Sequence, residues 1–204
     1  MERFIRGGIA AAVLGGLLLA AGAALLLMPD GHQQFSGQVL TGSFTVAATL
    51  RFTGAILMTW GIISLYLPQA DRAGRFGLVA VIATLANMAL QIGWIFCDLF
   101  AAPSFAHAAP GVLNNPSGPL VAGTVAAWVA NVSFVLLGIA TLRARVLPRT
   151  SGLALLIIGV ITVLPLPLPG SAYEIIIGIA FAVAGIRALT GTDRAPLPVQ
   201  PAAA

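Results

Sequence analysis

A stripe of polar side chains lies along the third long apolar segment of the chain, at spacings of four, three and four residues. Its members are Asn87, Gln91, Trp94 and Asp98. These spacings place all of them on one face of a helix, which we expect to point into a helical bundle. The fourth apolar segment carries a similar stripe with Trp128 and Asn131. Polar groups are costly inside a bilayer, so each of these side chains is a candidate functional residue.

Two interpretations of the facing stripes remain open. In the first, the amides of Asn87, Gln91 and Asn131 only bridge two helices, through hydrogen bonds worth about 0.6 kcal/mol each in a bilayer. In the second, the stripes line a ligand-binding pocket between the third and fourth segments. The side chains of that pocket would be Asn87, Gln91, Trp94, Trp128 and Asn131.

Three ionisable residues fall at a similar depth in their apolar segments. Arg51 lies about seven residues into the second segment, Asp98 near the end of the third, and Glu174 at the start of the sixth. An unpaired charge at that depth is unfavourable, so we expect Arg51 to form an ion pair with Asp98, Glu174 or both. On this hypothesis, loss of Arg51 or of Asp98 alone strands a charge.

Other chemistry has little support in the sequence. His32 and His107 are not spaced as paired metal ligands, and Cys97 is the single cysteine, so we expect no metal site and no internal disulfide. The chain has no motif of a serine hydrolase, zinc protease, phosphate-binding loop or dinucleotide fold. An enzyme acting near Asp98 and His107 is the least favoured interpretation, and no particular cofactor is indicated.

The composition is that of an integral membrane protein. Of the 204 residues, 59% are hydrophobic and 8% charged, whereas charged residues make up about a quarter of a soluble domain. The isoelectric point near 10.6 comes from arginines in short connections, because lysine is absent. Nucleic-acid binding needs a clustered cationic face, so we exclude that partner.

The distribution of arginine predicts the topology. Nine of the ten arginines lie before the first apolar segment, after the last, or in every second gap, and Arg51 is the exception. Short cytoplasmic loops retain basic residues, so we expect six spans with both termini in the cytoplasm. Abundant Ala, Gly, Pro and Arg, which have GC-rich codons, suggest a bacterial source and hence the bacterial inner membrane.

The fold class predicted is therefore an all-α integral membrane protein, a single bundle of six transmembrane helices within residues 1–189. The expected spans are 8–28, 44–67, 76–100, 120–142, 151–168 and 172–189. The first is too long for the roughly 7–15-residue core of a signal peptide, so we expect it to be retained. Prolines from Pro165 onward make the fifth either short or completed by an extended piece. Four prolines in 101–119 predict an external loop, and 190–204 a disordered tail.

The connection after the fourth span has a recognisable sequence. The run Arg143-Ala-Arg145-Val-Leu-Pro148-Arg149-Thr-Ser-Gly152 resembles the basic loop R-x-R-x-(hydrophobic)-P-R-W-x-G of small uncharacterised polytopic membrane proteins of bacteria. The resemblance covers about ten residues, and Thr150 stands where those proteins have an aromatic residue. It implies a cytoplasmic turn between two helices and no particular activity.

The favoured function is a non-catalytic accessory or scaffold subunit of a larger membrane complex. Small-residue faces on the first and last spans suit helix association. Examples of these residues are Gly8, Ala12, Gly16, Ala180 and Ala184. The alternative is a small transporter or a lipid- or quinone-binding protein that uses the pocket between spans three and four. Expected partners are the lipid bilayer and either other membrane subunits or a hydrophobic small molecule.

Overall fold

The chain folds into helices. The computed structural model describes residues 1–28, 34–164 and 166–191, and none of these residues is in a β-strand. The elements in chain order are α1 (Glu2–Leu25), α2 (Phe35–Gln38), α3 (Gly42–Tyr66), η1 (Leu67–Gln69), α4 (Ala70–Phe96), η2 (Cys97–Ala101), α5 (Ala102–Ala108), α6 (Pro110–Asn114), α7 (Pro119–Ala130), α8 (Val132–Ala144), α9 (Arg149–Val163) and α10 (Gly170–Gly191). The predicted disordered tail lies, from residue 192 on, outside the described residues.

Four helical stretches of the described chain are long and apolar enough to cross a membrane. They are Glu2–Leu25, Gly42–Ala108, Val121–Ala144 and Gly170–Gly191, and Arg149–Val163 is a shorter apolar helix. A helix needs about 20 predominantly apolar residues to span the hydrocarbon core of a bilayer. The predicted class, an all-helical membrane protein, is supported at this level.

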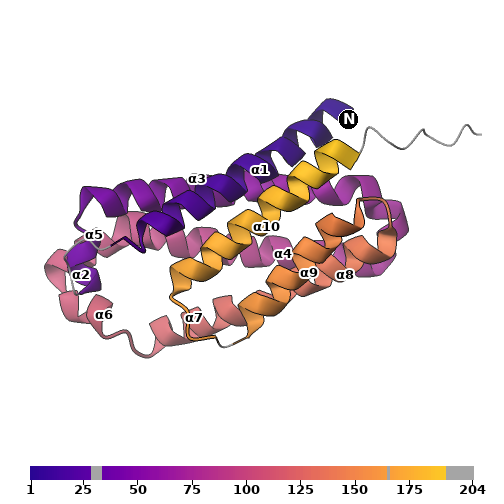
Figure 1. The fold of residues 1–204 in the computed structure, drawn as a ribbon. Coiled ribbons are helices and arrows are strands. Elements are labelled where there is room, and N and C mark those ends of the chain that lie inside the picture. Colours follow the sequence, from indigo (N-terminus) through magenta and orange to yellow (C-terminus); the bar gives the residue numbers. More distant parts are fainter. Residues whose placement is uncertain (29–33, 165, 192–204) are drawn as a thin grey trace, which may run out of the picture.

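The long helices lie side by side, so the bundle has two distinct ends (Figure 1). The start of α1, the end of α10, the α3–α4 connection and the α8–α9 connection lie at one end, which we call the basic end because these segments carry the arginines. The short helices α2, α5 and α6 lie at the opposite end, which we call the cap end. Segments that share an arginine pattern in the sequence therefore share an end of the bundle.

The connection between α3 and α4 contains a break in the helix. Gly74 has φ 57° and ψ −154°, a conformation that side chains with a Cβ rarely adopt. It falls in the link between the predicted spans 44–67 and 76–100, so the long helical stretch from Gly42 reverses its direction there and α4 packs against α3. Gln69 in this link is buried and donates to the carbonyl oxygen of Leu65 and to the hydroxyl of Thr141.

Helix α1 packs between α3 and α10 through small residues. A Cβ placed on Gly54 would lie 2.7 Å from the carbonyl oxygen of Gly15, and one on Gly16 would collide with the backbone of Gly178. The absence of side chains at these crossings lets the helix backbones touch, as in other small-residue helix pairs. The predicted small-residue faces of the first and last spans are thus used within the chain.

The polar stripe of the third span does not make α4 a helix that is buried on all sides. Cys97, which directly precedes Asp98, is exposed. Large apolar side chains of α4 are also exposed, for example Val79 at 60% and Ile82 at 57%. Polar residues identify one buried stripe of a membrane helix. The remaining surface of the same helix can face lipid when its side chains are apolar, so a polar stripe alone does not identify the central helix of a bundle.

The cap end is more helical than predicted. The prolines of 101–119 predict an external loop without a long helix, and the structure has two short helices there, α5 and α6. Pro103 and Pro110 each lie in the first turn of one of them, where proline is tolerated. Asn114 of α6 joins this layer to α2, since its Oδ1 accepts from the backbone N–H of Ser36 at 3.0 Å and its Nδ2 donates to Gln34. The predicted external loop therefore packs on the short segment that precedes α3.

Helix α9 is short, as the prolines after it predict. It has 15 residues and ends at Val163, which gives about 22 Å against a hydrocarbon core of about 30 Å. The hydroxyl of Tyr173 donates to the carbonyl oxygens of Leu164 and Leu166 and accepts from the N–H of Leu166. The backbone of Leu164 and Leu166, just after the end of α9, is thus hydrogen-bonded to a side chain at the start of α10.

Candidate functional site

Arg51 is buried in α3, near the cap end, and only 4% of its surface is exposed. Its neighbours on the buried face of α3 are small, including Ala47, Ala48 and Ala55. Space for its stem also depends on Gly22 of α1, because a Cβ there would lie 2.9 Å from the Cγ of Arg51. The sequence therefore surrounds one long cationic side chain with small residues from two helices.

Glu174 forms the strongest contact of Arg51. Its two carboxylate oxygens accept from Nε and Nη2 of Arg51, both at 2.6 Å. This two-bond geometry is that of a charge-assisted pair between a guanidinium and an ionised carboxylate. Because α10 begins at Gly170, Glu174 lies beyond the first turn, where the helix dipole has faded. The position of Glu174 is thus explained by Arg51 rather than by the helix end.

Asp98 forms a weaker contact with the same arginine. Its Oδ2 accepts from Nη1 of Arg51 at 3.2 Å. Asp98 belongs to η2, a single π-helical turn between α4 and α5. π-helical turns inside helices are rare and often occur at functional sites. The three ionisable residues singled out by their depth in the sequence are therefore brought together in one cluster, which we call the Arg51 cluster.

Three phenylalanine rings connect α3 with the turn that carries Asp98. The ring of Phe52 is 6.2 Å from that of Phe96 and 6.4 Å from that of Phe100, and Phe96 and Phe100 are 4.7 Å apart between centroids. Phe52 follows Arg51 in the chain, and the other two residues flank Asp98 by two residues on each side. Phe96 and Phe100 are 49% and 57% exposed, so these rings hold α3 against the turn from its outer side.

The Arg51 cluster contains one cation and two acids. The side chains of Arg51, Asp98 and Glu174 are 5%, 14% and 16% exposed. Two ionised carboxylates would leave one negative charge uncompensated in this buried site, which is unfavourable. The geometry therefore permits binding of one further positive charge.

The predicted polar stripe divides into buried and exposed parts. Asn87 donates through Nδ2 to Oδ1 of Asn131 at 3.1 Å and to the hydroxyl of Ser133 at 3.3 Å, and both asparagines are buried. Trp94 and Trp128 are each 37% exposed. The geometry favours the bridging interpretation for the two asparagines, and the indoles do not converge with them in one buried pocket.

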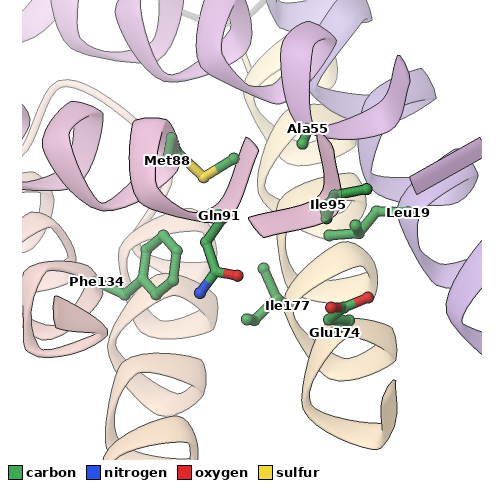
Figure 2. Close-up of a pocket in the computed structure, with 8 residues that line it drawn as sticks. All are labelled: Leu19, Ala55, Met88, Gln91, Ile95, Phe134, Glu174 and Ile177. Atoms are coloured by element: carbon green, nitrogen blue, oxygen red, sulfur yellow. The ribbon is translucent and has the colours of Figure 1, made fainter. Parts of the chain in front are cut away.

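Gln91 lies in a different place from the other members of the stripe. It lines a cavity together with Leu19, Ala55, Met88, Ile95, Phe134, Glu174 and Ile177. Figure 2 shows its carboxamide reaching from α4 toward Ile177 and Glu174 of α10. The cavity measures about 20 Å³, which is room for a single water molecule and too small for an organic ligand.

The histidines do not extend the site. His107 lies in α5 and is exposed, and His32 lies outside the described residues. Within the described residues, no group of three or more His, Cys, Asp and Glu side chains is placed to hold a metal ion. The Arg51 cluster is thus the candidate functional site.

Several buried polar residues were not singled out from the sequence. Thr84 donates to the carbonyl oxygen of Ser133, and Ser151 donates to that of Ala184, each from a buried position. Oδ1 of Asn87 and the hydroxyl of Ser64 are buried without a hydrogen-bond partner. Ser and Thr readily bond to their own helix backbone, so their presence in an apolar segment is a weak signal of function.

Comparison with known proteins gives no relative: no family model matches the chain, and no curated protein or solved structure matches it significantly. Any function must therefore be argued from the geometry of the chain itself.

Proposed function

We propose that this chain is a six-span integral membrane protein of the bacterial inner membrane that serves as a non-catalytic subunit of a larger membrane assembly. The helical stretch Gly42–Ala108 has 67 residues. As one straight helix it would measure about 100 Å, which is more than three times the thickness of the hydrocarbon core of a bilayer. Because α3 and α4 pack against each other, this stretch supports two spans rather than one. Helix α9, completed by the non-helical residues after it, supplies the remaining span.

The proposed orientation places the basic end in the cytoplasm. The arginines of α1, of the start of α4, and of the α8–α9 connection all belong to segments at that end. Positive residues in short loops are retained on the cytoplasmic side. The cap end, with the Arg51 cluster beneath α2, α5 and α6, then faces outward.

The observation that carries the subunit proposal is the uncovered surface of α7. Helix α8 buries seven residues, but none of the α7 residues whose burial is described, 121–130, is buried, although both helices belong to the same apolar stretch. Val125 and Val129 are 51% and 55% exposed. Helix α7 also carries Ala122, Ala126 and Ala130 at four-residue spacing, which allows a neighbouring helix to approach closely. We propose that a transmembrane helix of another subunit packs on α7.

Site-specific photo-cross-linking tests this proposal. A photoreactive residue at Ala126 should give one cross-linked protein of discrete mass in native membranes. The matched control is Ile157 of α9, which is 55% exposed and is not on α7. The same residue at Ile157 should give no such product. Lipid adducts alone at Ala126, or the same products from both positions, would contradict a subunit interface on α7.

A second candidate function rests on the two half-exposed indoles. Trp94 and Trp128 come from neighbouring helices, α4 and α7, and a Cβ on Gly123 of α7 would lie 3.8 Å from the ring of Trp94. Amphipathic aromatic side chains at such a seam suit a lipid or quinone that binds from the side. Binding there would need no internal cavity.

Fluorescence quenching tests the second candidate. The third tryptophan, Trp60, lies against Phe4 at 5.7 Å between ring centroids, and Trp60→Phe removes its signal. A short-chain quinone added to this variant in detergent should quench the remaining emission with saturation. Quenching that is linear in quinone concentration would show collisions only and would exclude the seam as a binding site.

A further inference from the structure

We infer that the Arg51 cluster is a proton-binding site, in which Asp98 carries one exchangeable proton on Oδ1 while Arg51 and Glu174 remain an ionised pair. The inference starts from the charge count. Arg51 supplies one positive charge and faces two carboxyl groups, in a site whose three side chains are at most 16% exposed. A net negative charge held away from water is costly, and one bound proton removes that charge.

The geometry assigns the proton to Asp98. Glu174 accepts two bonds of 2.6 Å from Arg51, and this requires both of its oxygens to be acceptors. Asp98 accepts one bond of 3.2 Å, on Oδ2, from the remaining terminal nitrogen. A neutral carboxyl group can accept on one oxygen and carry hydrogen on the other. Proton uptake therefore adds one O–H bond at Oδ1 and breaks no bond to Arg51.

Among the described residues, no further charged side chain lies near Asp98 on the elements packed against it. The turn η2 packs against α3, α4 and α5, and Glu174 arrives from α10. In α3 the other ionisable residue is Tyr66, at the far end of the helix, and the charged residues of α4 precede Phe76. The remaining titratable groups on these elements are Cys97, which is exposed next to Asp98 in η2, and His107, which is exposed in the last turn of α5. Helix α10 adds Tyr173, next to Glu174, and Arg187 near its other end. The charges that act on Asp98 are those of Arg51 and Glu174.

A proton fits the site better than a metal cation. The described residues offer no set of three metal-ligating side chains, and the cavity beside Glu174 holds about one water molecule. Asp98 retains 14% exposure of its side chain, so its carboxyl group is not sealed inside the bundle. The binding of the proton does not depend on the proposed orientation or on a partner subunit.

Infrared spectroscopy of the purified protein, reconstituted in lipid, tests the inference. A protonated carboxyl group gives a carbonyl stretching band that disappears when it ionises. The wild-type chain at neutral pH should show this band, and aspartate labelled with ¹³C at the carboxyl carbon should shift it. The chain has only two glutamates, Glu2 and Glu174, so the label separates the two acids of the cluster.

Three variants sharpen the test. Asp98→Asn should remove the band, and Asp71→Asn, a change of an exposed aspartate, should retain it. Glu174→Gln should also abolish the band, because Asp98 then becomes the only anion available to Arg51. A band that the aspartate label leaves in place, or the absence of any band at neutral pH, would overturn the inference. The label experiment uses the wild-type chain, so it stands even if a variant fails to fold.

Discussion

Replacing Arg51 with methionine should be the most damaging single change at the candidate site. The substitution keeps most of the volume but leaves Glu174 without a cation, in a pocket where its side chain is 16% exposed. Breaking a buried ion pair by removing one partner costs about 3–5 kcal/mol. For a chain of this size, each kcal/mol lowers the melting temperature by about 2–4 °C, so Arg51→Met should lower it by about 6–20 °C.

A triple variant separates the effect of the unpaired charge from the effect of the changed side-chain shape. Arg51→Met with Asp98→Asn and Glu174→Gln leaves three neutral side chains, so no charge is stranded, and stability should return to within about 1–2 kcal/mol of wild type. Thermal unfolding in one detergent, followed by circular dichroism at one scan rate, provides the measurement. The control is Arg187→Met, which removes an exposed arginine of α10 and should change stability by about 0.5 kcal/mol or less.

For the single substitution Asp98→Asn, the structure changes what the sequence-based hypothesis predicts. That hypothesis expected a stranded charge after loss of Asp98, but Arg51 keeps two bonds to Glu174. We therefore expect Asp98→Asn to cost much less than Arg51→Met. The account of the Arg51 cluster is refuted if Arg51→Met is no more damaging than Arg187→Met, or if the triple variant is less stable than Arg51→Met.

Three further changes test the packing of the helices and the cap of α3. Gly16→Ala should destabilise by about 1–3 kcal/mol because the new Cβ meets the backbone of Gly178, whereas Gly93→Ala, with open space around it, should be neutral or stabilising in the same thermal assay. Thr41→Ala should cost about 1 kcal/mol, because the hydroxyl caps α3 by accepting from the N–H of Phe44 at 3.2 Å; unchanged stability would show that the cap contributes nothing.

The clustering of Arg51, Asp98 and Glu174 was predictable because buried charge leaves few alternatives. Three ionisable residues at one depth of a bilayer must pair or reach water, and only one of them is a cation. The bridge between Asn87 and Asn131 follows from the same reasoning applied to amides. Predictions of this kind succeed where an unpaired group would be expensive.

The rest of the site depends on packing that an apolar sequence encodes weakly. Lipid is as apolar as a protein core, so the pattern of Trp94 and Trp128 does not distinguish an indole that faces lipid from one that faces the bundle. The π-helical turn that contains Asp98 has no sequence signature, and the helices α5 and α6 depend on contacts with residues such as Ser36. The exposed surface of α7 likewise becomes visible only when the other helices are in place.

The most direct test of the membrane account is the sidedness of four positions in a Cys97→Ser background. Single cysteines at Ser43 and Ala108, at the cap end, should react with a membrane-impermeant maleimide in intact cells. Cysteines at Leu67 and Thr150, at the basic end, should react only after the membrane is permeabilised. All four positions are exposed, so burial does not limit the reaction. Labelling of Leu67 or Thr150 in intact cells, or protection of Ser43 or Ala108, would contradict six spans with both termini in the cytoplasm.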